Sequence, residues 1–257
     1  MIASRGQATP AGSGSDAVAG AALRAGDAAE PVDYIRPVSK STRDLRVGIV
    51  EDETLMRSIL TGLVDGEPHM RVVHSASGFD EARRIIEPRS IDIAMVDVDL
   101  GDGNGVALSV LLQRADPRLA ILLLSSHDVM DLVLSVKDQV SRPWSYLSKK
   151  SSLSKDVLLR ALVATARGQV VLDPFLTRKA SPQADSPLAQ LTDSQISVLR
   201  LVAEGFSNTA VANLLGLSPR SVENHLLATY KVLGVSSGES NPRVMAVLAF
   251  LQQTSRY

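Results

Sequence analysis

Two apolar segments of this chain end abruptly in carboxylates. Residues 91–97 have the pattern of a strand buried on both faces, and Asp97 stands where that strand emerges, before a glycine-rich turn. Residues 46–50 have the same pattern and end in Glu51 and Asp52. Because ligands bind at the carboxyl edge of the strands in open α/β sheets, we expect the three carboxylates to share one site. A group of this kind suits a hard divalent cation such as magnesium.

Two further apolar segments end in groups that can bind phosphate. Residues 120–124 lead to the hydroxyl of Ser125, and residues 144–148 lead to the ammonium group of Lys149. An ammonium group and a hydroxyl opposite a metal-bound carboxylate can surround the three equatorial oxygens of a phosphoryl group. The pattern therefore predicts a phosphoryl-transfer site in which Asp97 is the nucleophile and Mg²⁺ offsets its charge.

The segments that position these groups alternate between strand and helix patterns. We expect strands at 46–51, 71–76, 92–97, 119–125 and 144–148, and helices at 53–64, 79–87, 105–114, 128–138 and 154–167. This strict alternation predicts an α/β fold, a doubly wound, flavodoxin-like sheet of five parallel strands with right-handed crossovers.

The other segments differ in composition from this alternating part. Residues 1–44 are rich in Ala, Gly and Ser and are expected to form a disordered N-terminal extension, which leaves 45–169 for the α/β domain. The polar, proline-containing segment 170–190 has the composition of a linker. Residues 191–257 have helical periodicity and no convincing strand, so we expect a small all-α domain there.

The overall composition excludes several classes of function. The chain has 257 residues and no cysteine, which excludes disulfides, thiolate catalysis and cysteine-ligated zinc. The 27 Lys and Arg residues nearly balance the 28 Asp and Glu residues, so a surface that binds nucleic acid has to be local. The longest apolar runs are too short to span a bilayer, and no basic segment precedes an apolar one at the start. We therefore expect a cytoplasmic protein without a membrane partner.

With these strand ends, residues 46–168 resemble the receiver domain of two-component response regulators. The resemblance implies that Asp97 accepts a phosphoryl group from a sensor histidine kinase. It also implies the roles of the surrounding residues: Glu51, Asp52 and Asp97 hold Mg²⁺, Ser125 is the switch hydroxyl, Lys149 contacts the phosphate, and Tyr146 is the aromatic residue that turns inward when Ser125 engages phosphate.

Several positions depart from the pattern of this family. Gly101 stands where many members have proline, Ser125 replaces the commoner threonine, and Lys150 replaces an aspartate that often follows the lysine. None of the three changes removes a reactive group, so phosphorylation is still expected. Asp99 and His127 occupy positions that tune autodephosphorylation in the family, and their charge leaves the lifetime of the phosphorylated state open.

The C-terminal segment has the pattern of a helix-turn-helix. Asp193 is the expected N-cap of one helix, and Ser207 or Asn208 begins the next. Gly216 closes that second helix, and a proline at the first helical position opens a third at 219–233. Two short helices joined by a tight turn that contains glycine form a helix-turn-helix motif, whose second helix lies in the major groove of DNA.

Residues 191–208 and 217–226, with the Lys-Val-Leu-Gly-Val segment that starts at Lys231, look like the LuxR-type DNA-binding domain. A receiver followed by this domain is the arrangement of NarL/FixJ-type response regulators. The resemblance implies a regulator of transcription, not an enzyme, which binds promoter repeats in double-stranded DNA and forms a homodimer on activation, with 244–251 as the dimer helix. It implies that Glu223, Asn224 and Leu227 face base edges, while Asn208, Arg220, Ser221 and Lys231 approach phosphates.

The charge of this segment is unusual for the family. Glu223 and Thr209 stand where many members carry lysine, and the basic residues of 191–257, Arg243 among them, are nearly cancelled by acidic ones. The electrostatic part of the DNA affinity is therefore expected to be small. Glu223 can instead accept a hydrogen bond from cytosine N4.

Two other classes of function stay open on the sequence. A pseudo-receiver, regulated by protein contacts alone, would have the same fold without phosphorylation. Asp97 and Asp99 also match the aspartate-x-aspartate motif of haloacid-dehalogenase-type phosphatases, but this interpretation leaves Glu51 and Asp52 without a role, and no helical cap region follows. A calcium loop is excluded because Leu108 stands where the bidentate glutamate is required.

Overall fold

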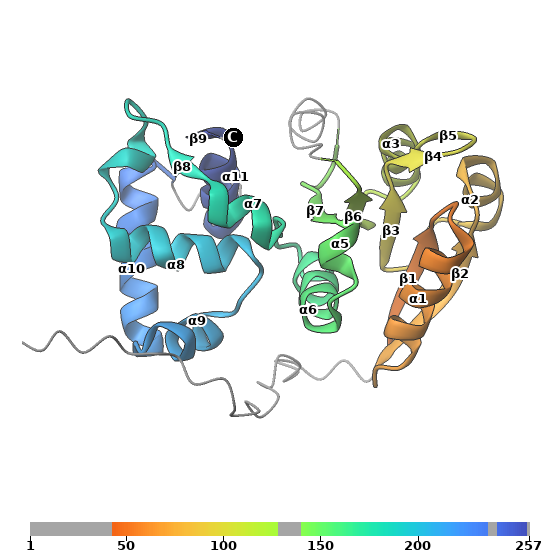
Figure 1. Ribbon diagram of the computed structural model, residues 1–257, viewed down its shortest axis with the longest axis horizontal. Helices are drawn as coiled ribbons and strands as arrows, with labels where there is room; N and C mark the ends of the chain where they lie inside the picture. The colour runs from red at the N-terminus through yellow and green to blue at the C-terminus, as the bar shows by residue number, and fades with distance from the viewer. Residues whose placement is uncertain (1–42, 128–139, 236–240, 256–257) are drawn as a thin grey trace, which may run out of the picture. The chain divides into compact units, whose positions relative to one another are not determined.

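The computed structural model describes residues 43–127, 140–235 and 241–255 (Figure 1). The helix expected at 128–138 lies outside the described residues, and so does the predicted N-terminal extension apart from residues 43 and 44. No helix in the described ranges is long and apolar enough to cross a bilayer.

Five parallel strands form the main sheet, in the order β2-β1-β3-β6-β7. This order confirms the predicted α/β fold. Each strand begins and ends within one residue of the expected bounds. The bounds could be predicted because the sequence of a strand buried on both faces is a short apolar run that ends abruptly in polar residues. The strands are β1 (Leu45–Val50), β2 (Met70–Ala76), β3 (Ile93–Asp97), β6 (Ala120–Ser125) and β7 (Ser145–Ser148).

Helices pack on both faces of this sheet. On β3, Ile93 and Met95 belong to the core that α1 (Thr54–Asp65) and α6 (Lys155–Ala166) cover. The alternating residues Ala94 and Val96 belong to the core on the opposite face, under α2 (Phe79–Ile85) and α3 (Gly105–Ala115). The period of two along the strand therefore sends successive side chains into opposite layers and leaves the strand end as the place for polar groups.

Residues 170–190, the predicted linker, contain short regular elements. They are α7 (Pro174–Lys179), the 3-10 helix η2 (Pro187–Gln190) and β8 (Ser181–Pro182), which pairs with β9 (Thr254–Ser255). The buried Asp173 accepts hydrogen bonds from the amides of Ser148, at 2.8 Å, and Phe175, at 2.7 Å. One carboxylate therefore binds the end of β7 and caps α7. The bounds of the linker stay a prediction.

In the described residues of 191–257 four helices form the C-terminal domain, which confirms its predicted helical character, although the two-residue strand β9 was not expected there. Thr192, not the predicted Asp193, is the N-cap of the first helix, and it forms a reciprocal capping box with Gln195. Gly216 ends the second helix with a left-handed φ of 66°, and Ser218 caps the third. This tight turn is the centre of the helix-turn-helix motif. The helices are α8 (Asp193–Ala203), α9 (Asn208–Leu215), α10 (Pro219–Val232) and α11 (Pro242–Gln252).

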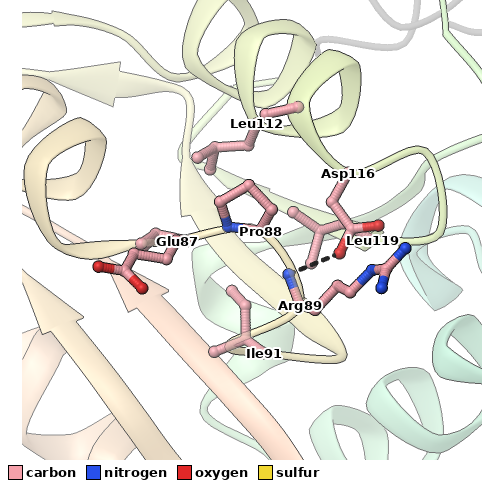
Figure 2. A pocket seen from close by; sticks show the side chains of 9 residues that line it. Glu87, Pro88, Arg89, Ile91, Leu112, Asp116 and Leu119 are labelled. Carbon is pink, nitrogen blue, oxygen red and sulfur yellow. Dashed lines mark hydrogen bonds between the residues drawn. The ribbon is translucent and has the colours of Figure 1, made fainter.

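A small apolar pocket lies at the amino edge of the sheet, opposite the strand ends that carry the carboxylates (Figure 2). Its one buried acid is Asp116, whose oxygens accept hydrogen bonds from the amides of Arg89, at 2.9 Å, and Arg118, at 3.1 Å. Because this carboxylate is satisfied by backbone amides, it closes a turn and offers no reactive group to a ligand.

Candidate phosphoacceptor site and DNA-binding surface

Three carboxylates meet at the carboxyl edge of the sheet, as their positions in the sequence predict. Glu51 follows β1 and Asp97 ends the neighbouring β3, and both are fully buried. Asp52 is exposed beside them. One oxygen of each residue lies within 4.8 Å of the others, so the three acids can bind one ion together.

Lys149 bridges the two buried acids. It follows the last strand of the sheet and opens the short helix α5 (Lys149–Ser152). Its Nζ atom lies 2.8 Å from Oε1 of Glu51 and 2.7 Å from Oδ2 of Asp97. The ammonium group therefore offsets the negative charge of both buried acids.

The pKa values at this site follow from burial and from these ion pairs. Burial raises the pKa of Glu51 and of Asp97, and the hydrogen bonds from Lys149 offset only part of that increase. Burial lowers the pKa of Lys149, but its hydrogen bonds to the two carboxylates outweigh that effect, so its pKa is raised. Negative charge at this edge of the sheet is thus costly unless a cation stays close.

The donor set fits Mg²⁺. The Oε2 atom of Glu51 is buried and makes no hydrogen bond in the described part of the chain. Together with Asp52 and Asp97 it offers carboxylate oxygens, the ligands that magnesium prefers, and the exposed side at Asp52 leaves room for the water ligands that it retains.

The loop after Asp97 is held by its own backbone. It folds into a hairpin of β4 (Asp99–Leu100) and β5 (Gly103–Asn104). The amide of Asp99 donates to Asp97 at 3.2 Å, and the amide of Gly101 donates to Asp52 at 3.1 Å. A proline at position 101 has no N–H to donate, so the departure noted in the sequence supplies this second bond. The amides of this loop therefore orient the carboxylates of both Asp52 and Asp97.

Asp102 lies in the loop after Asp97 and has a role that the sequence analysis did not assign. Its carboxylate accepts hydrogen bonds from the amides of Phe79, at 2.7 Å, and Asp80, at 3.1 Å, and these bonds lower its pKa. It therefore supplies acceptors to the first turn of α2, 23 residues away in the sequence. The only signal was an acidic side chain in a glycine-rich turn, which does not say which amides it binds.

The two candidate switch residues, Ser125 and Tyr146, both form hydrogen bonds with the backbone of His127. Ser125 is fully buried, and its hydroxyl accepts a hydrogen bond from the amide of His127 at 3.1 Å. Tyr146 is 2% exposed, with its ring turned inward, and its hydroxyl donates to the carbonyl of His127 at 2.7 Å. The imidazole of His127 faces Asp99 at 3.9 Å, and both side chains are exposed.

The expected DNA-contacting residues of α10 lie on one side of that helix. Glu223, Asn224 and Leu227 are exposed, as are Arg220 and Lys231. Their spacing of three or four residues brings them to one helix face. The exposed fraction of Leu227 is 64%, which is unusual for a leucine in a packed helix.

Two further expected phosphate contacts have partners within the protein. The hydroxyl of Ser221 is 2.8 Å from that of Ser218, so it belongs to the cap of α10. Asn208 is half-buried, and its side-chain oxygen accepts a hydrogen bond from Arg243. Arg243 is thus not the freely solvated charge that the sequence analysis counted.

Comparison with known proteins finds two families along the chain. Residues 47–162 match the response regulator receiver domain, and residues 189–240 match the bacterial regulatory proteins of the luxR family. The nitrate/nitrite response regulator protein NarP of Escherichia coli is 29% identical over 213 residues, which cover 81% of this chain and 95% of NarP. The DNA-binding transcriptional activator DevR/DosR of Mycobacterium tuberculosis is 28% identical over 205 residues, which cover 74% of this chain and 89% of that protein.

Solved structures give similar matches. The crystal structure of response regulator ChrA, from a heme-sensing two-component system, is 26% identical and has a TM-score of 0.42. The match covers 82% of this chain and 98% of ChrA.

Proposed function

Because the chain belongs to the two-component response regulators that join a receiver domain to a LuxR-type DNA-binding domain, we propose that phosphorylation of Asp97 controls its binding to DNA. The donor is a sensor histidine kinase. The observation that supports this site most strongly is the contact of Lys149 with both Glu51 and Asp97 beside the exposed Asp52.

Each residue of the site then has a chemical role. An oxygen of Asp97 forms a new P–O bond as the P–N bond of a phosphohistidine breaks, and the electron pair leaves on the imidazole nitrogen, which takes up a proton. Lys149 moves from the carboxylates to a phosphoryl oxygen, and Ser125 donates its hydroxyl to another. Glu51, Asp52 and Asp97 would hold Mg²⁺, which supplies positive charge while two anionic groups approach each other.

Phosphorylation by a small-molecule donor tests this assignment. Incubation with acetyl phosphate should add one phosphoryl group to the wild-type protein in Mg²⁺ and none in EDTA, as measured by intact mass. The Asp97→Asn variant should remain unlabelled, while the matched Asp99→Asn variant, which removes an exposed carboxylate two residues away, should still be labelled. Label on Asp97→Asn, or equal labelling in EDTA, would refute the assignment.

This labelling experiment and an assay with a generic phosphomonoester together separate the two other classes of function. A pseudo-receiver would take up no label under any condition. An aspartate-nucleophile phosphatase would turn over a generic phosphomonoester many times per chain, whereas a receiver makes and hydrolyses only its own acyl phosphate. Lack of turnover together with labelled Asp97 supports a regulator rather than an enzyme.

We propose that Tyr146 and Ser125 carry the signal to the surface. Tyr146 is already turned inward and bonded to the carbonyl of His127, so engagement of Ser125 by phosphate acts on a preformed contact. The expected output is a homodimer, since paired recognition helices read repeated sites about one helical turn apart. Sedimentation with and without beryllofluoride measures this, and an unchanged oligomeric state would argue against dimerisation as the output.

A further inference from the structure

The guanidinium of Arg243, near the start of α11, is largely removed from solvent. Nη1 donates to Oδ1 of Asn208 at 2.9 Å, Nη2 donates to the carbonyl oxygen of Phe206, and Nε is buried without a hydrogen-bond partner. Burial lowers the pKa of Arg243, and no carboxylate of the described residues pairs with it. Because arginine keeps its proton in proteins, a cation stands directly behind the first residue of α9.

The contact fixes which end of the Asn208 side chain faces outward. A guanidinium has donors only, so the group that meets Arg243 has to be the carboxamide oxygen, and the NH2 group points away. In the described part of the chain Nδ2 makes no hydrogen bond, and it is not among the buried atoms that lack a partner. Since phosphate oxygens only accept hydrogen bonds, this is the orientation in which Asn208 can bind DNA.

We propose that Arg243 is a positioning residue for DNA binding, which turns the amide of Asn208 so that its NH2 group donates to a DNA phosphate. The proposal rests on the DNA-binding function proposed above. It also uses the place of Asn208 at the start of α9, where the helix N-terminus adds to the attraction of an anion. The charge of Arg243 then acts from behind the amide without touching DNA.

The test compares the full-length protein and its variants by fluorescence anisotropy on two duplexes. One duplex is selected from a random pool by the wild-type protein, and the other is unselected. Arg243→Met and Asn208→Ala should each weaken binding about tenfold per subunit on both duplexes, because a phosphate contact carries no sequence information. The slope of log affinity against log salt should change little in Asn208→Ala, because a neutral amide that binds a phosphate releases no counterion. Arg178→Met removes an exposed cation from α7 and is the matched control, with a slope like that of the wild type.

The double variant tests whether Arg243 acts through Asn208. If it does, Arg243→Met in the Asn208→Ala background causes little further loss. Multiplied losses, or wild-type DNA affinity in Arg243→Met, would overturn the proposal. Failure of the wild-type protein to bind any duplex would instead refute the proposed DNA-binding function.

A second variant covers the case in which Arg243→Met does not fold. In Asn208→Asp the new carboxylate pairs with Arg243, so the midpoint of thermal unfolding should rise. DNA binding should nevertheless fall below that of Asn208→Ala, because a carboxylate then faces the phosphate. Equal DNA affinity for these two variants would overturn the proposal.

Discussion

Replacement of Lys149 by methionine should destabilise the receiver domain far more than its partly exposed position suggests. The change leaves Glu51 and Asp97 buried beside each other without a cation. At about 2.7 Å and an effective dielectric constant of about 20, each of the two contacts is worth about 6 kcal/mol of Coulomb energy. Desolvation of the charges offsets much of this, and the loss of one partner from a buried ion pair costs about 3–5 kcal/mol.

Urea unfolding of the Lys149→Met variant measures this loss, and pH changes it in a predictable direction. Without Lys149 the pKa values of Glu51 and Asp97 rise further above those of the unfolded chain, so the native state binds more protons. The free energy of unfolding of the variant should therefore fall as the pH rises from about 5 to about 8. Mg²⁺ should stabilise the variant more than the wild type, since no ammonium group then competes for the carboxylates.

Lys150→Met is the matched control for this experiment. Lys150 is the next residue in the chain and is exposed, so its replacement should change stability by less than about 0.5 kcal/mol. If the two variants unfold at the same urea concentration, or if the stability of Lys149→Met does not depend on pH, the electrostatic account of this site is wrong.

Three further predictions concern the backbone and the DNA surface. Gly105→Ala would place a Cβ atom 1.8 Å from the carbonyl oxygen of Asp97 and should cost at least about 3 kcal/mol of stability. Gly62→Ala, at an exposed position of α1 where a Cβ atom would meet nothing within 4 Å, should instead add about 0.5–1 kcal/mol, and urea unfolding compares the two variants. Asp102→Ala should lower the midpoint of thermal unfolding near neutral pH. Because hydrogen bonds lower the pKa of the Asp102 carboxyl, the difference from wild type should shrink as the pH falls toward about 3. Glu223→Lys should raise affinity for all DNA and, if Glu223 reads a cytosine, reduce discrimination at one base pair by about 1–3 kcal/mol. Anisotropy on matched and single-base-variant duplexes measures both effects, and an unchanged ratio of the two affinities would exclude base reading by Glu223.

The sheet and its acidic edge could be predicted because both follow from local patterns. Strands covered on two faces appear as apolar runs, and parallel topology then brings Glu51 and Asp97 to neighbouring strand ends without any knowledge of tertiary contacts. The N-cap of α8 was also predictable, since Thr192 and Gln195 have the spacing of a capping box, but Asp193 is an equally good cap by type.

Contacts made by single polar side chains could not be predicted in this way. Asp102 binds amides of α2, and Arg243 reaches back 35 residues to Asn208. Neither contact leaves a periodic signal, because only the packed fold decides which amide or carboxamide is within reach. The burial of Arg243 is the clearest case, since a basic residue near the start of a helix is normally solvated.

A chimeric regulator that carries this receiver would need more of the chain than the sheet and its helices. Asp173 binds the amide of Ser148, next to Lys149, and also the first turn of α7. A fusion made at residue 169 therefore removes an acceptor from the strand end that bears the lysine, whereas a fusion made after Lys179 keeps both bonds. An effector attached after Lys179 would follow α7, and Asp173 links the start of that helix to the end of β7. The length of the spacer between α7 and the effector therefore becomes a design variable, in addition to the sequence of the spacer.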